Sequence, residues 1–176
     1  MYRGVFILKK NIYIFILILI ILFPGCSSER NPEIGSEYLK HRGYDVISYE
    51  GNIETYQLTK ETLTQLRYLL LWSVQKTNPV DYLGKQVYVE KFIVKNHPLD
   101  AWRSALLHSL GKTEIHLFII GNKVVGGISA PVIKGDNTKI ASNIYSLEGK
   151  NITEVHSMDF NTWKEQLLKS LENVDD

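Results

Sequence analysis

The longest hydrophobic run in the chain is residues 12–23, twelve apolar or aromatic positions without a polar interruption. Three basic residues precede this run, the last of them Lys10, and Pro24, Gly25 and Cys26 follow it. A helix of twelve residues rises about 18 Å, whereas the hydrocarbon core of a membrane is about 30 Å thick. A basic segment, a short apolar segment and a small residue before a break are typical of an export signal.

Cys26 is the only cysteine of the chain, so it cannot form a disulfide within it. Residues 22–26 (LFPGC) resemble the lipobox of bacterial lipoproteins, although Phe23 and Pro24 differ from the leucine and the small residue usual there. The resemblance implies that 1–25 is a signal peptide and that Cys26 receives a diacylglyceryl group. Two acyl chains are enough for stable anchoring. An uncleaved N-terminal anchor, and an ordinary signal with an incidental Cys26, remain as alternatives.

The pattern after the leader predicts a tether over 26–35 and one domain over 36–176. The tether is small, polar and interrupted by proline. A short helix is expected from Ser36, as N-cap, to Gly43. A strand over 44–50 should follow, turned by Gly51-Asn52 into a second extended piece.

Leucines at positions 63, 66 and 70, followed by Val74, predict a helix that Thr59 caps and that runs to Lys76. A buried strand over 68–74 is the competing interpretation. Asn78-Pro79 should start another short helical turn. Residues 86–95 (QVYVEKFIVK) predict a central strand.

The second half of the chain mixes both periodicities. Residues 100–112 predict a helix capped by Asp100, with Trp102, Leu106 and Leu110 on one side. The other expected elements are strands over 114–120 and 123–130 joined by a Gly121-Asn122 turn, a loop over 131–141, a strand over 143–147 and a final helix capped by Asp159. The predicted fold class is α+β: a mainly antiparallel sheet with a central β-hairpin, packed by three to four helices, after an N-terminal lipoprotein signal helix.

Charge restricts the classes of partner. All 19 acidic residues follow Cys26, but only 17 of the 20 lysines and arginines do, so that part carries a net charge of −2. Nucleic-acid-binding domains are usually strongly basic, so no nucleic acid is expected as a partner. The expected membrane contact is the diacylglyceryl group on Cys26, on the outer face of the cytoplasmic membrane of a bacterium.

Three segments resemble a known family: residues 38–46 (YLKHRGYDV), residues 81–98 (DYLGKQVYVEKFIVKNHP) and residues 122–127 (NKVVGG). Together they look like an uncharacterised domain of Gram-positive secreted or lipid-anchored proteins, over roughly residues 36–132. The resemblance implies no catalytic residue.

The candidate chemistry is concentrated after the central strand. His97 and Asp100 lie three residues apart, where a general base and the carboxylate that orients it could meet. The competing interpretation is a turn in which the His97 side chain binds local backbone groups. The five histidines lack the spacing of common metal motifs, so neither a metal nor another cofactor is expected.

Two functions of different classes follow from these patterns. The first is a lipid-anchored, non-enzymatic surface domain that binds an envelope protein or peptide through one face of its sheet, with His97, Asp100 and Trp102 as candidate binding residues. The second is a small envelope hydrolase that uses His97 and Asp100. A regulatory partner of another protein is a third hypothesis.

Overall fold

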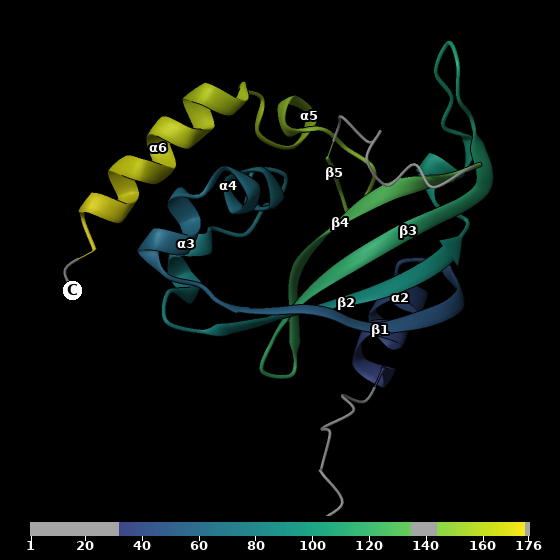
Figure 1. Cartoon of the computed structure of the whole chain (residues 1–176), viewed down its shortest axis with the longest axis horizontal. Helices are drawn as coiled ribbons and strands as arrows, with labels where there is room; N and C mark the ends of the chain where they lie inside the picture. Colours follow the sequence, from purple (N-terminus) through teal and green to yellow (C-terminus); the bar gives the residue numbers. More distant parts are fainter. Residues whose placement is uncertain (1–31, 135–143, 175–176) are drawn as a thin grey trace, which may run out of the picture. The chain divides into compact units, whose positions relative to one another are not determined.

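The structure is a computed structural model that describes residues 32–134 and 144–174 (Figure 1). These residues form a five-stranded antiparallel sheet in which the spatial order follows the sequence order. The strands are β1 (Asp45–Gln57), β2 (Gln86–Lys95), β3 (Ser109–Ile120), β4 (Lys123–Ile133) and β5 (Tyr145–Ser146). The predicted α+β class with a mainly antiparallel sheet is confirmed, and the predicted signal helix lies outside the described residues.

Five α-helices belong to the described part of the chain, where three to four were predicted for the domain. They are α2 (Glu33–His41), α3 (Lys60–Thr64), α4 (Leu66–Trp72), α5 (Ile152–His156) and α6 (Phe160–Glu172), and the two 3-10 turns are η1 (Pro79–Tyr82) and η2 (Pro98–Ala101). None of these helices is long and apolar enough to span a membrane.

The sheet is buried on both faces, so the expected binding through one face of the sheet is wrong. Alternate residues of β2 point to opposite sides, so Val87 and Val89 enter one core while Phe92 and Val94 enter the other. The first core lies against α3, α4 and α6 and contains Trp72 and Phe118, with ring centroids 5.5 Å apart. The second core includes Leu39 of α2. Burial on two sides explains why apolar residues stand at consecutive positions of β2, over 87–89 and 92–94.

The predicted break of β1 at Gly51-Asn52 is wrong. The backbone continues through Gly51 at φ +92° as one edge strand paired with β2, and three register shifts interrupt the ladder. These shifts lie between Val46 and Ser48, between Tyr49 and Gly51, and between Asn52 and Glu54. A glycine with positive φ can form a bulge as well as a turn, so its presence alone did not distinguish the two.

The single helix predicted after Thr59 is also wrong, as is the competing strand over 68–74. Thr59 does cap α3, but Gln65 is extended (φ −75°, ψ 133°) and separates α3 from α4. The break changes the helical phase, so that Leu69 and Trp72 are buried while Leu66 is 63% exposed. Leu63 and Val74 of the predicted stripe are buried but Leu66 is not, so the stripe does not continue through the break.

The helix predicted over 100–112 is wrong as well. The turn η2 ends at Trp102, whose backbone is extended (φ −62°, ψ 136°), and β3 already begins at Ser109. Between them, an isolated antiparallel bridge joins Arg103 to His108. We call residues 103–108 the β2–β3 hairpin. The projecting green-blue loop at the upper right of Figure 1 corresponds to it.

Other elements agree with the sequence patterns. The predicted short helix is present as α2, but it begins at Glu33 after Pro32 and not at the predicted N-cap Ser36, so residues 33–35 of the predicted tether belong to the helix. The structure confirms the start at Asn78-Pro79, strand β2, the Gly121-Asn122 turn and α6 with its Asp159 cap. The strand predicted over 143–147 is the two-residue β5. The loop predicted over 131–141 is wrong for 131–133, which belong to β4, and residues 135–141 lie outside the described residues.

Candidate functional site

The candidate residues lie where β2 ends. The strand stops at Lys95, and Asn96 takes a left-handed conformation (φ 63°) that turns the chain into η2. His97 is the N-cap of η2 and is only 4% exposed. Its Nδ1 accepts a hydrogen bond from the Leu99 N–H at 3.1 Å, and its Nε2 lies 2.9 Å from the Leu147 carbonyl oxygen. These two contacts fix the neutral tautomer with the proton on Nε2.

The burial of His97 also sets its protonation. Loss of hydration lowers its pKa, although the Leu147 carbonyl and the negative charges of Asp100 and Glu148 act in the opposite direction. The neutral ring is therefore favoured, but both of its nitrogens are already engaged by backbone groups. A general base needs a free nitrogen directed at its substrate, and this ring offers none.

Asp100 lies near His97 but does not orient its ring. One carboxylate oxygen accepts from the His97 backbone N–H at 3.2 Å, and the other accepts from the Thr113 hydroxyl at 2.7 Å. Together with the Nδ1 contact, the first bond makes a capping box around η2. The structure thus brings the two predicted residues together, in the geometry of a structural cap.

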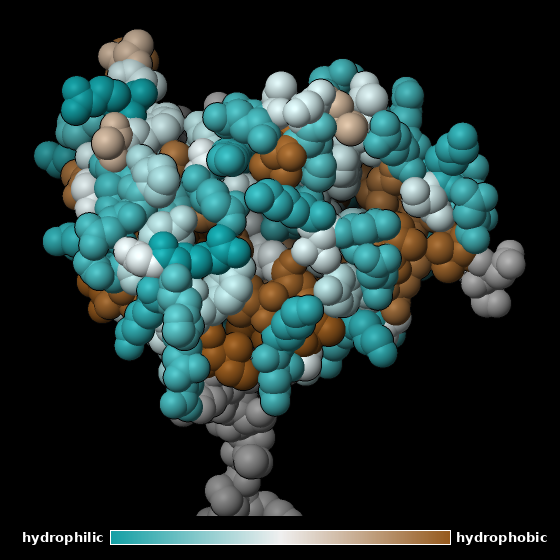
Figure 2. Space-filling view, turned by 180° about the vertical axis from the view of Figure 1, so that it is seen from behind, coloured by the Kyte–Doolittle hydropathy of each residue, from teal (hydrophilic) through white to brown (hydrophobic). Residues whose placement is uncertain are grey.

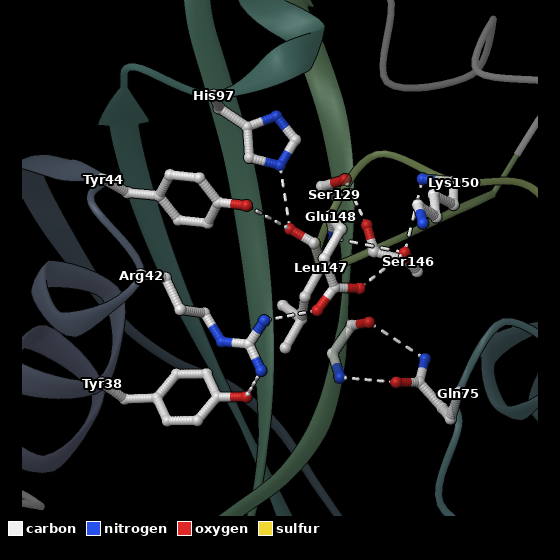
Figure 3. Close-up of polar contacts among 11 residues, drawn as sticks. Tyr38, Arg42, Tyr44, Gln75, His97, Ser129, Ser146, Leu147, Glu148 and Lys150 are labelled. Atoms are coloured by element: carbon white, nitrogen blue, oxygen red, sulfur yellow. Dashed lines mark hydrogen bonds and ion pairs between the residues drawn. The ribbon is translucent and has the colours of Figure 1, made fainter. Parts of the chain in front are cut away.

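The Leu147 carbonyl is the centre of a wider polar cluster (Figure 3). It accepts from the Tyr44 hydroxyl at 3.1 Å as well as from His97, and the two rings lie 4.8 Å apart between centroids. Beside it, Glu148 pairs with Arg42, which also donates to the Tyr38 hydroxyl at 2.6 Å. This cluster therefore holds the segment after β5 against α2, β1 and η2.

Glu148 is held as a carboxylate within this cluster. Partial burial opposes its ionisation, but the hydrogen bond from Ser146 and the charge of Arg42 lower its pKa overall. Ser146 in turn accepts from the backbone N–H groups of Glu148 and Lys150. The Ser146 side chain therefore fixes the turn that follows β5.

Trp102 supports the base of the β2–β3 hairpin. Its indole N–H donates to the Tyr145 hydroxyl at 3.2 Å, and its carbonyl accepts from the Ser109 N–H at 2.8 Å. Beyond it, Leu106 is 92% exposed, the highest value among the large hydrophobic residues that the structure exposes. Figure 2, drawn from the opposite side, shows tan and brown atoms projecting at the upper left, where this hairpin lies.

A second charged group lies on the sheet. Glu114 of β3 contacts Lys91 of β2 at 2.8 Å and His116 at 2.7 Å. The hydrogen bond from His116 and then that from Lys91 outweigh burial and lower the pKa of Glu114 to about 2. Sequence reasoning missed this group, although Glu114 and His116 are two residues apart in a predicted strand and so had to share a face.

A cavity of about 200 Å³ lies between α6 and the segment before η1. Its lining includes Gln75, His156, Trp163 and Gln166. The Nε2 of His156 is buried and has no hydrogen-bond partner among residues 32–134 and 144–174. Burial lowers its pKa, while the nearby carbonyls of Gln75 and Ser73 act in the opposite direction.

Metal ligands are not gathered anywhere in the described ranges, since no three histidine, cysteine, aspartate or glutamate side chains there are placed to hold an ion. Cys26, the predicted lipidation site, lies outside them. No family model matches the chain, and neither a similar curated protein nor a similar solved structure was found. The family resemblance of the three segments stays a prediction.

Proposed function

We propose that the protein is a non-enzymatic binding module, held on the outer face of the cytoplasmic membrane of a bacterium by a diacylglyceryl group on Cys26. The observation that carries the binding role is the β2–β3 hairpin, which presents an almost fully exposed leucine on an ordered turn. Burial of such a side chain against a partner would be favourable, and the order of the turn lowers the entropy cost of binding.

The contacts of His97 support binding over hydrolysis. The hydrolase hypothesis requires His97 to take a proton and Asp100 to orient its ring. Instead, the ring nitrogens of His97 face the Leu99 N–H and the Leu147 carbonyl, and the oxygens of Asp100 face the His97 N–H and Thr113. Both side chains are therefore engaged in contacts that stabilise the turn η2.

The arrangement of the domain is compatible with an anchor before α2. In Figure 1 the described chain enters at the start of α2, below the sheet, and the β2–β3 hairpin projects above the sheet. A tether that ends before α2 would therefore attach at one end of the described domain, and the hairpin lies at the other. A binding module on a membrane surface benefits from this separation, because its contact residues stay accessible.

The lipid anchor is tested with the full chain and its Cys26→Ser variant, both expressed in a Gram-positive host. We expect the wild-type protein to sediment with membranes and its mature N-terminal peptide to begin at Cys26 with the mass of a diacylglyceryl group added. The variant should keep its leader and incorporate no labelled fatty acid. A mature N-terminus at another residue, or equal fatty-acid labelling of the two proteins, would contradict the proposal.

A further inference from the structure

We propose that the β2–β3 hairpin is the docking element of this module, and that its partner is a protein with an apolar socket bordered by carboxylates. The inference rests on the proposed function, because it names the chemistry of the partner that the binding module would take. It is carried by the exposure, the rigidity and the charge of the hairpin.

The exposure of the hairpin is not required by the fold. Leu106 is 92% exposed and Leu110, at the start of β3, is 51% exposed. Neither side chain belongs to the two cores of the domain. Burial of such a side chain in a partner would be favourable, whereas its exposure to water contributes nothing to folding.

The hairpin is ordered by its own contacts. The Ser104 N–H donates to the Leu107 carbonyl at 2.7 Å, and the Ser104 hydroxyl lies 3.4 and 3.1 Å from the N–H groups of Leu106 and Leu107. The bridge between Arg103 and His108 closes the turn, and Trp102 fixes its base through Tyr145. A preorganised loop loses little conformational entropy on binding, which favours affinity.

Two cationic side chains lie at the hairpin. Arg103 precedes its tip and Lys112 follows on β3; both are at least partly exposed, and neither is in an ion pair within the described residues. The nearest acidic groups in the sequence, Asp100 and Glu114, are engaged by Thr113 and by Lys91 with His116. A socket with carboxylates at its border would match this pattern.

A protein fits this surface better than a membrane does. A polybasic lipid-binding patch usually has about four to eight lysines and arginines. The hairpin and the start of β3 carry two, Arg103 and Lys112. A lipid bilayer and a second copy of the chain are separate outcomes of the test below.

The test uses the full, lipidated chain with a photo-crosslinking amino acid in place of Leu106, irradiated in living cells. The matched control carries the same amino acid in place of Asn122, the exposed turn residue between β3 and β4. We expect position 106, and not position 122, to give a discrete protein adduct. Crosslinking to lipid alone, to another copy of the chain or to nothing would overturn the proposal.

The partner recovered from that adduct is then purified and its affinity for variants is measured. We expect Leu106→Asp to weaken binding at least about tenfold, as loss of a central contact does. Leu66→Asp, at a leucine 63% exposed on α4, should leave the affinity unchanged. The double variant Arg103→Glu/Lys112→Glu should weaken binding most at low salt. Equal affinities for the Leu106 and Leu66 variants would overturn the proposal.

The two proposals fail in different ways. If Cys26→Ser behaves like the wild type in fatty-acid labelling, the anchor is lost, but the affinities of purified proteins still report on the hairpin. If labelling depends on Cys26 and position 106 gives no protein adduct, the anchor stands and the docking element is rejected. Circular dichroism of Leu106→Asp and Leu66→Asp checks that both variants are folded.

Discussion

The outer edge of β4 is completed in two different ways along its length. At Ile128 and Ser129 it pairs with the backbone of β5. At Val125 and Gly127 its backbone groups are instead bound by side chains: the Gln75 amide donates to the Gly127 carbonyl at 3.0 Å and accepts from the Gly127 N–H at 2.8 Å. The Thr77 hydroxyl donates to the Val125 carbonyl at 2.9 Å. The pairing with β5 is between main chains and tolerates many residues, whereas the stretch at Val125 and Gly127 depends on two side chains, the Gln75 amide above all.

The largest expected effect is that of Gln75→Leu. This change leaves the Gly127 N–H and carbonyl buried without partners and also removes the bond from Gln75 to the Leu71 carbonyl. Each unsatisfied buried group costs about 1–3 kcal/mol, so we expect the free energy of unfolding to fall by about 3–5 kcal/mol. Urea denaturation measures it.

The control for this prediction is Gln65→Leu, at an exposed glutamine between α3 and α4 whose side chain makes no capping bond. It should change the free energy of unfolding by less than about 0.5 kcal/mol. Equal losses for the two variants would show that Gln75 does not complete the edge.

The second prediction concerns the two glycines that allow the close approach. A Cβ on Gly127 would lie 2.5 Å from the His116 carbonyl oxygen, whereas one on Gly126 would lie 2.5 Å from Oε1 of the Gln75 side chain. Because a neighbouring strand yields less than a side chain, Gly127→Ala should destabilise by about 2–3 kcal/mol and more than Gly126→Ala.

A double-mutant cycle tests the origin of the Gly126 effect. Gly126→Ala should cost less in a Gln75→Ala background than in the wild type, because the clashing amide is gone. Additive losses would contradict the contact that we assign to Gln75.

The third prediction compares how His97 and His156 change the pH dependence of stability. Burial lowers the pKa of His97, beside Leu147, and of His156, beside Gln75, so the unfolded chain takes up protons first as the pH falls. Stability should therefore decrease below about pH 6.5, the ordinary histidine pKa. His97→Gln should flatten this dependence more than His156→Gln, because the ring of His97 is the more buried.

Chemical denaturation at pH 7.5, 6.5 and 5.5 checks this dependence. The contribution of Glu114 falls in a separate window: its folded pKa of about 2 lies below the ordinary 4.5, so its stabilisation is lost as the pH falls from about 4.5 towards 2. A decrease that starts only near pH 4.5 would exclude the histidines as its cause.

The smallest expected effect is that of Thr77→Val. The change keeps the shape of the side chain and removes the single bond to the Val125 carbonyl, so we expect a loss of about 1 kcal/mol. The same urea titration measures this loss. A loss as large as that of Gln75→Leu would contradict the larger contribution to stability that we assign to Gln75.

Local signals predicted the elements whose causes are local. Gly121-Asn122 and the Asp159 cap act within a few residues, and both were identified correctly. The bonds from Gln75 to Gly127 span 52 residues of sequence, and no local pattern indicates them. The Gln65 break likewise follows from the need to bury Leu69 and Trp72, which only the assembled core imposes.

The sequence predicted correctly that His97 and Asp100 lie close together, but not that they act as a structural cap. His97 and Asp100 are indeed close. However, the carbonyl that accepts the hydrogen bond from the imidazole Nε2 belongs to Leu147, fifty residues later in the sequence. The spacing of Trp102, Leu106 and Leu110 suggested a buried helical stripe, whereas Leu106 and Leu110 face solvent on a hairpin and a strand. Apolar spacing alone cannot distinguish a core contact from a contact with another molecule.

The three register shifts of β1 affect how this edge strand could pair with another molecule. They divide the free border of this strand into short stretches whose amides and carbonyls do not keep a common spacing. A second extended chain arriving there could match only a few residues before its alignment failed, so polymerisation through this border is disfavoured. Many copies could therefore lie close together without fusing their sheets.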